Sequence, residues 1–236
     1  MAYKQEIKLI KNWKKNTFYI SVMQLTLLIV NFFLITIISR EYGAEIYGEY
    51  ASSKSLSVLI GTAIVMSLAL VVTKALAKNS EDSKLLFVNS YYIIFRNFFI
   101  TLLILFPVTL LFQRDFSMTA LFLMGFVFNE LIHVALAFFQ SRGDFVTSSK
   151  QIFIRTVLYG IGALIIVFQG FSIIFLIVFQ VFMLVLFFII AHMSIPKNEK
   201  IFKTTSAPNV KSKLQKSGKK MVLTTFSSAL ISELDI

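Results

Sequence analysis

The chain has 236 residues, of which 57% are apolar, and its mean hydropathy is +0.79. Soluble domains usually contain about 45–50% apolar residues, so this composition excludes an ordinary soluble domain and predicts an integral membrane protein. The formal net charge is +11, but the lysines gather at the ends of long apolar runs, where they flank membrane spans, so we expect no nucleic-acid partner. The absence of cysteine excludes disulfides and cysteine-ligated metals.

The first element in the chain is a basic segment, residues 1–16, which is followed by an apolar run from Thr17 to Ser39. At 23 residues this run is longer than the ~7–15 residues of a cleaved signal peptide, so it predicts the first membrane span. Four of the five lysines of the basic segment fall on one helical stripe, a pattern typical of a helix that lies on anionic lipid of the inner leaflet; these are Lys4, Lys8, Lys11 and Lys15. An ordinary positive flank of the first span explains the same residues equally well.

Six apolar segments of 18 to 27 residues follow one another, each about long enough to cross ~30 Å of hydrocarbon as a helix. The predicted spans are Thr17–Ser39, Ser55–Val72, Leu86–Phe112, Phe116–Gln140, Ser149–Phe168 and Ile173–Met193. The last two come from one uncharged stretch, residues 156–196, which would be ~60 Å long as a single helix. We therefore expect a turn at Gln169–Ser172, where Gly170 is a turn signal. The sequence predicts an all-α membrane protein with a six-helix transmembrane bundle.

Lysine and arginine are distributed unevenly between the two ends of these spans. Nineteen lie in the N-terminal segment, after the second and fourth spans and after the sixth span, whereas only Arg40, Lys54 and Arg114 lie on the opposite side. Because cytoplasmic loops carry the excess of positive charge, we expect a cytoplasmic N-terminus.

The sequence divides into four parts. Residues 1–16 form the basic cytoplasmic segment, residues 17–193 the six-helix lobe, and residues 194–220 a cytoplasmic linker with eight lysines. Residues 221–236 become apolar again, but they are too few to cross a bilayer. We interpret them as the truncated start of a seventh helix; a complete six-helix protein with a short amphipathic tail is the alternative.

Two opposite charges lie inside the predicted membrane region. Arg96 in the third span and Glu130 in the fourth each lie ~15 Å from the cytoplasmic end of the helix, because the two spans run in opposite directions. An ionisable side chain at this depth costs about 2.5–3.5 kcal/mol and usually faces a partner or a cavity. We therefore predict that Arg96 and Glu130 pair or share one polar cavity, with Asn129 and His133 on the helical face of Glu130.

A thin polar stripe on the first span, which includes Gln24 and Asn31, would line the same cavity. From the residues alone, two structural explanations stay open: these groups join helices by hydrogen bonds, and Arg96 extends its charge to the inner interface. The sequence contains no HExxH, P-loop, GxSxG or GxGxxG motif, and its outer loops are short. We expect no catalytic residue, no metal site and no cofactor.

The outer loop after the first span reads R-E-Y-G-A-E-I-Y-G-E-Y from Arg40 to Tyr50. Gly43 and Gly48 would permit a tight loop and the restart of a helix. This segment resembles the R-x-hydrophobic-G-x-x-x-(F/Y)-G-x-(Y/F) loop of polysaccharide flippases in the multidrug/oligosaccharidyl-lipid/polysaccharide exporter superfamily. Lys74–Lys78 and Phe138–Phe145 resemble the family's basic extension after the second helix and its loop after the fourth.

The resemblance covers nearly the whole chain and implies the N-terminal lobe of a transporter with about 12–14 helices. It implies that the full protein moves undecaprenyl-pyrophosphate-linked oligosaccharide across the bacterial cytoplasmic membrane for capsule or O-antigen assembly, without covalent chemistry. Arg96 would then contact the pyrophosphate or an acidic sugar. Glu130 and His133 would tune that charge, and a proton or Na⁺ would couple transport.

Three other functions remain open. An antiporter of drugs or organic cations in the same superfamily would need a net acidic cavity, which Arg96 opposes. An enzyme of the same pathway would need a sizeable loop or catalytic residues at the membrane face. A non-transporting membrane scaffold is the third alternative, because half a transporter cannot alternate access by itself.

Overall fold

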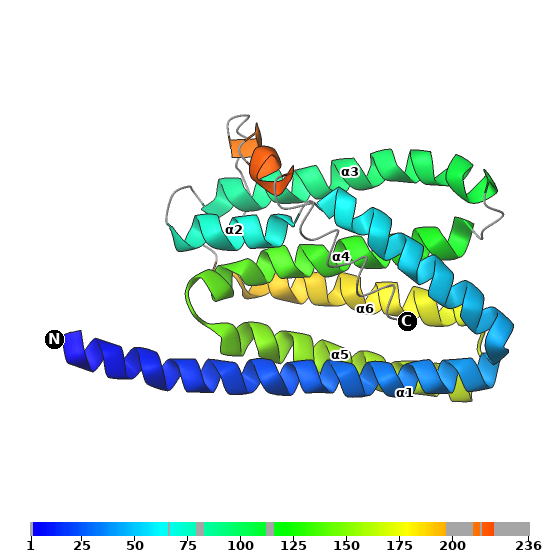
Figure 1. The fold of residues 1–236 in the computed structure, drawn as a ribbon, viewed down its shortest axis with the longest axis horizontal. Helices are drawn as coiled ribbons and strands as arrows, with labels where there is room; N and C mark the ends of the chain where they lie inside the picture. The colour runs from blue at the N-terminus through cyan, green and yellow to red at the C-terminus, as the bar shows by residue number, and fades with distance from the viewer. Residues whose placement is uncertain are drawn as a thin grey trace.

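The computed structural model describes residues 2–65, 67–78, 83–111, 116–196, 210–212 and 214–219 (Figure 1). The helices are α1 (Ala2–Val65), α2 (Leu68–Ala77), α3 (Ser83–Leu111), α4 (Phe116–Ser141), α5 (Phe145–Phe168) and α6 (Ile173–Ser194). All regular secondary structure in the described residues is helical. The predicted start of a seventh helix, residues 221–236, lies outside them, as does most of the linker.

Five of these helices, all except α2, are long and apolar enough to cross a membrane. Their outward faces carry large apolar side chains, among them Phe32, Leu103 and Phe168, which are 68%, 78% and 69% exposed. A water-soluble chain would bury such residues, whereas lipid tails are a favourable surrounding for them. The chain is therefore an all-α, multi-pass membrane protein.

The first two predicted spans are both contained in α1. Gly43 (φ 84°, ψ 165°) is the non-helical residue inside it, and it divides α1 into a first arm, residues 2–42, and a second arm, residues 44–65. Figure 1 shows the two arms meeting at a sharp bend. The expected count of six separate spanning helices is thus not confirmed, and the second arm begins well before the predicted start at Ser55.

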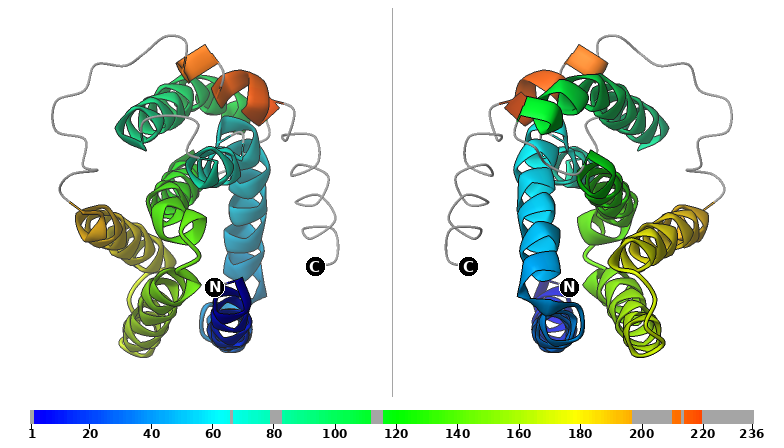
Figure 2. Two further views of the ribbon diagram at one scale, coloured as in Figure 1. Left: turned by 90° about the vertical axis from the view of Figure 1, so that its left-hand side faces the viewer. Right: turned by 90° about the vertical axis from the view of Figure 1, so that its right-hand side faces the viewer.

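The first arm packs along α5, and a hydrogen bond near each of its ends connects it to the loops that flank α5. The Asn16 amide donates to the Gly143 carbonyl (2.9 Å), and the Tyr42 hydroxyl donates to the Phe171 carbonyl (2.7 Å). Between these bonds the helices approach closely, since a Cβ added to Gly160 would lie 2.9 Å from Val30. Seen along the helices, the first arm and α5 lie at one end of the bundle and α3 at the other (Figure 2).

The second arm leaves the first and packs on α4, where the buried Ser57 hydroxyl lies 2.8 Å from the Thr119 carbonyl. The helix is interrupted after Val65, and α2 begins behind Ser67, which has a left-handed backbone (φ 52°). On α3, the Asn97 amide donates to the Ile64 carbonyl (3.0 Å), a group close to this interruption. The predicted second span is therefore two helical pieces.

Helix α4 is the centre of the bundle, because it contacts every other helix. Its bounds agree with the predicted span to within one residue, and so do those of α6. The expected turn between α5 and α6 is present: Gly170 has a positive φ of 72°, and the Ser172 hydroxyl accepts a bond from the Phe175 amide (3.4 Å). Apolar run length and turn chemistry predict this half of the bundle well.

Replacing Gly43 by alanine tests whether the bend needs a glycine. The backbone at Gly43 lies in a region that essentially only glycine adopts, and a Cβ added there would have no neighbour within 4 Å, so the cost of a side chain is conformational rather than steric. We expect Gly43→Ala to lower the free energy of unfolding by about 1–3 kcal/mol in a detergent-unfolding titration.

Gly48→Ala is the matched control, because Gly48 is helical and equally uncrowded. Alanine there should leave stability unchanged or raise it by about 0.5–1 kcal/mol. Equal effects of the two substitutions would show that Gly43 is not required for the bend.

Candidate functional site

A cavity of about 230 Å³ lies inside the bundle, between both arms of α1 and helices α4, α5 and α6. It is lined by Leu27, Val30, Asn31, Lys54, Ser57, Val58, Phe122, Gly125, Phe126, Asn129, Arg155, Thr156, Tyr159, Gln180, Met183 and Leu184. Pockets that enclose a whole drug-sized ligand measure roughly 300–1,000 Å³. In this conformation the cavity therefore has room for a charged group or several water molecules, but not for an oligosaccharide.

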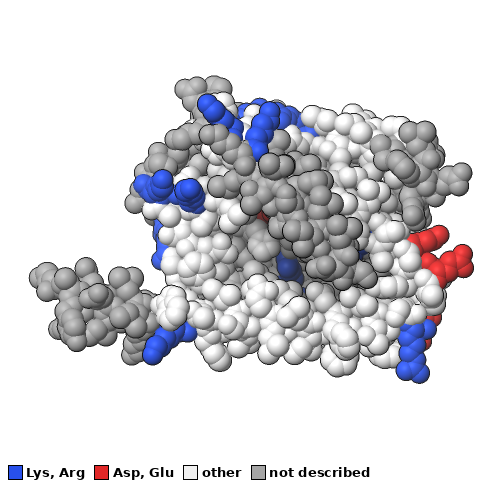
Figure 3. Space-filling view, in the orientation of Figure 1, with Lys and Arg blue, Asp and Glu red and all other residues white. Residues whose placement is uncertain are grey.

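The cavity is polar and positively charged. Half of its lining side chains are polar, and two of them, Lys54 and Arg155, are cations. Among the described residues no aspartate or glutamate lines it. In Figure 3 the face over the bundle is white and grey, and a few blue atoms are visible near its middle. A polar, cationic chamber inside an apolar bundle is typical of a pathway or binding site in a membrane protein.

Arg155 reaches the cavity because of where α5 begins. The Asp144 carboxylate caps this helix by accepting bonds from the Thr147 amide (3.1 Å) and hydroxyl (2.6 Å). With the helix starting at Phe145, Arg155 lies ten residues into it, ~15 Å from its end. Its Nη1 donates to the Asn129 side-chain oxygen (2.9 Å), which holds the guanidinium against α4.

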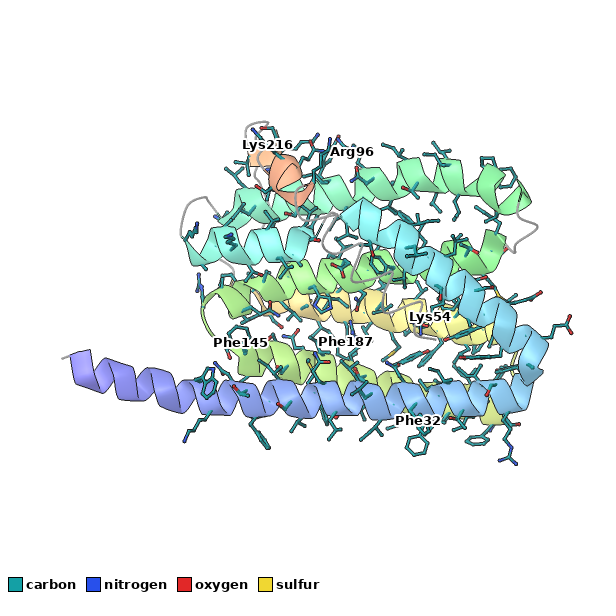
Figure 4. The ribbon with its side chains drawn as sticks, viewed as in Figure 1. Phe32, Lys54, Arg96, Phe145, Phe187 and Lys216 are labelled. Atoms are coloured by element: carbon teal, nitrogen blue, oxygen red, sulfur yellow. The ribbon has the colours of Figure 1, made fainter. Side chains whose placement is uncertain are left out.

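Lys54 reaches the cavity because the second arm begins directly after Gly43. Ten residues of helix, about 15 Å, separate the start of this arm from Lys54. Figure 4 places Lys54 between the helices rather than at their ends. One turn further along, Ser57 also lines the cavity, so this face of the second arm is polar.

The cavity lining also carries neutral hydrogen-bonding groups. The Tyr159 hydroxyl donates to the Gln180 side-chain oxygen (3.3 Å), and the Tyr159 ring stacks on Phe179 with centroids 6.3 Å apart. Tyr159 and Gln180 join α5 to α6 at the cavity and present a phenol and an amide to its contents.

The structure brings together some of the residues that the sequence predicts for a site. Asn31 and Asn129 line the cavity. His133 lies one helical turn beyond Asn129 and within electrostatic range of Arg155, but it is not part of the lining. Gln24 is an exposed residue of the first arm and also lies outside the lining, as does Glu130. The roles predicted for these side chains in binding a substrate stay predictions.

Arg96 and Glu130 are not brought together. The Arg96 guanidinium donates to the side-chain oxygen of its neighbour Asn97, through Nη2 (2.8 Å) and Nε (3.3 Å), and it forms no ion pair with Glu130. The reason lies in the faces of α3: Ile93 and Ile94 are fully buried, whereas Tyr92, one turn before Arg96, is 49% exposed. Figure 4 shows Arg96 at the outer edge of the bundle. The predicted pairing is wrong because matching depth does not imply a shared face.

The charge distribution along the sequence assigns both cavity cations to the ends of the spans. Lys54 directly precedes the predicted second span, and Arg155 lies near the start of the predicted fifth span. The signals that could have placed them are helix boundaries: Gly43 restarts a helix, and Asp144 with Thr147 begins one. Lys54 and Arg155 each lie about ten residues after one of these helix starts, which places both side chains within the membrane.

The chain matches no family model, no curated protein and no solved structure. The resemblance to polysaccharide flippases therefore depends on the loop motifs and the order of the spans.

A cysteine scan can test whether the cavity contains water, because the natural chain has no cysteine. Asn31 lines the cavity, whereas its neighbour Phe32 is 68% exposed on the outer face and points away from the bundle in Figure 4. We expect a charged, water-soluble thiol reagent to modify Asn31→Cys in membranes at least tenfold faster than Phe32→Cys, since thiolates form in water and not in lipid. Equal rates at the two positions would show that the chamber is dry or closed.

Proposed function

We propose that the protein is a transporter of the bacterial cytoplasmic membrane that moves undecaprenyl-pyrophosphate-linked oligosaccharide units to the outer leaflet for capsule or O-antigen assembly. The observation that carries the proposal is the cavity, in which Lys54 and Arg155 are the charged lining residues. The loop from Arg40 to Tyr50 supports it through its resemblance to polysaccharide flippases.

The charge of the cavity favours an anionic cargo. Arg155 is held by the neutral Asn129, and among the described residues no carboxylate forms an ion pair with it. Charge-assisted hydrogen bonds from arginine to phosphate are strong, especially where water is scarce. In the proposed mechanism Arg155 and Lys54 contact the pyrophosphate, while Asn129 and Gln180 offer hydrogen bonds to the first sugar.

The cavity volume implies that transport needs a change of shape. A chamber of about 230 Å³ accommodates a pyrophosphate but not the sugars attached to it, so the helices around it must separate. Since the two arms of α1 form one side of the chamber, movement between them and helices α4 to α6 would open it. In the proposed transporter this lobe acts with a second one, as the resemblance implies.

Glu130 and His133 are the candidate coupling groups. They follow Asn129, which holds Arg155, by one and four residues on α4. We propose that binding of a proton or Na⁺ at these side chains alters the attachment of Arg155 to α4 and thereby the affinity for the anion. An antiporter of organic cations is disfavoured, because no described carboxylate lines the cavity and Arg155 repels such a cargo.

The lysines support an orientation with the N-terminus in the cytoplasm. In Figure 3 blue side chains gather at the end of the bundle where α1 starts, and red ones at the opposite end. That opposite end contains the bend at Gly43, with Glu41 and Glu45 beside it. The proposed topology has the two arms of α1 each crossing the membrane once, so that six segments cross in all.

Single cysteines test this topology. Ala44 is exposed at the bend, and Lys78 is exposed at the end of α2. A membrane-impermeant maleimide added to spheroplasts should modify Ala44→Cys but reach Lys78→Cys only after the membrane is opened, because the two residues lie at opposite ends of the bundle. The reverse pattern would place the N-terminus outside and contradict the proposed direction of transport.

Substituting Arg155 tests the proposed function itself. In a strain that lacks the gene, we expect the Arg155→Gln variant to restore at most about a tenth of the wild-type amount of surface polysaccharide. The reason is that a hydrogen bond to a charged group contributes about 1.5–3 kcal/mol. Lipid-linked oligosaccharide should accumulate on the cytoplasmic leaflet of the same cells. Arg155→Lys should retain part of the activity, because it keeps the charge and loses the planar fork.

Lys150→Gln is the control, because Lys150 is an exposed cation of the same helix, near the ring of Tyr19. It should restore normal polysaccharide. Normal polysaccharide with Arg155→Gln, or drug sensitivity as the sole phenotype of the deletion, would contradict the flippase proposal and favour an antiporter.

A further inference from the structure

Two cations, Arg96 of α3 and Lys211 of a later segment, lie near Tyr92 on the outer face of α3. The Lys211 ammonium lies 4.1 Å from the centroid of the Tyr92 ring, a cation–π contact. Arg96 follows Tyr92 by four residues on the same helix and therefore lies on the same face, one turn away. Figure 4 shows Arg96 beside the short helix that carries Lys216. We call Tyr92, Arg96 and Lys211 the α3 patch.

Lys211 is held there by a short amphipathic helix. Residues 210–212 and 214–219 are helical, and Figures 1 and 2 show them lying against α3. Val210 and Leu214, four residues apart, are only 8% and 3% exposed and belong to the same buried cluster as Ile94. Lys216 and Lys219 remain exposed. The apolar face of this helix is thus fixed on the bundle, which presents its lysines at the membrane.

The described residues around the α3 patch supply no carboxylate to its two cations. In the part of the chain that the structure describes, no carboxylate forms an ion pair with Arg96 or Lys211. The guanidinium uses Nε and Nη2 on the neutral Asn97 side chain, so Nη1 has no protein acceptor among the described residues. Two neighbouring cations on an apolar surface favour an anion between them.

The surroundings identify the source of that anion. Further along α3, Phe99, Ile100 and Leu103 are 61%, 49% and 78% exposed, so the patch continues into an apolar face that lipid tails cover. Tyr92 and Arg96 lie ~13 Å and ~20 Å from the start of α3, beside the helical segment that carries the exposed lysines Lys216 and Lys219. Headgroups that these lysines attract can therefore reach the patch.

We propose that the α3 patch binds the phosphate of an anionic phospholipid in the leaflet at the lysine-rich end of the bundle. The phosphate bridges Arg96 Nη1 and the Lys211 ammonium, and the acyl chains follow the apolar face of α3. The bound lipid joins the short helix at residues 210–219 to α3. This site is separate from the cavity and does not depend on the proposed transport function.

The test measures lipid binding to the purified full chain by native mass spectrometry, with dioleoylphosphatidylglycerol as the anionic probe and dioleoylphosphatidylcholine as the neutral one. We expect the wild-type protein to retain the anionic lipid preferentially. Lys211→Gln and Arg96→Gln should each weaken its binding roughly fivefold, because a basic residue near the membrane surface contributes about that factor. Lys211→Arg should restore the wild-type affinity.

Lys78→Gln is the matched control, since it removes an exposed lysine at the same end of the bundle and should leave binding unchanged. Lys211→Gln changes a side chain outside the spanning helices. Lipid binding of this variant can therefore be measured even if Arg96→Gln does not fold. Unchanged affinity of Lys211→Gln, or equal retention of the two lipids, overturns the proposal. Full displacement of the lipid by millimolar glycerol phosphate also overturns it, because the ligand is then a free phosphate ester.

Discussion

The bend at Gly43 is the constraint on which the rest of the structure depends. Without it, the 64 residues of α1 would form one helix of ~96 Å, about three times the hydrocarbon thickness. Because the reversal takes place in one residue, the two arms diverge from a single point, one onto α5 and the other onto α4. The cavity is the space that these diverging arms and helices α4 to α6 enclose. Backbone geometry at one glycine thus determines that the bundle has a chamber.

The chemistry of the chamber follows from this geometry and from the start of α5. Both cations lie about ten residues from a helix start, so the same helical rise brings Lys54 from one membrane surface and Arg155 from the other toward the middle. Apolar packing around them lowers the local dielectric, which strengthens any contact to an anion. Asn129 on the central helix α4 fixes Arg155 with one hydrogen bond, so the charge is oriented without being neutralised. These properties suit reversible binding of an anionic group better than tight, permanent pairing.

The sequence predicted more of the fold than of the site, for physical reasons. Apolar run length gives α4 and α6 to within one residue, because lipid imposes a length on each span. Apolar run length does not predict the start of the second arm, because Lys54 interrupts the apolar run although it lies inside the helix. Depth along a helix placed Arg96 and Glu130 at one level, but which face each occupies depends on packing against neighbours that a single sequence does not reveal. Asn31 and Asn129, by contrast, were predicted for a cavity and do line one.

The interruption between the second arm and α2 has a mechanical consequence. A continuous helix resists bending because its main-chain hydrogen bonds must be broken, whereas here the regular pattern already ends at Val65 and resumes behind Ser67. The Asn97 amide of α3 donates to the Ile64 carbonyl on one side of this joint, and such a bond contributes about 0.5–1.5 kcal/mol net. On the other side, Leu68 and Val72 of α2 are fully buried in the main apolar cluster, so side-chain packing, and not a continuous helical backbone, determines the angle between α2 and the second arm.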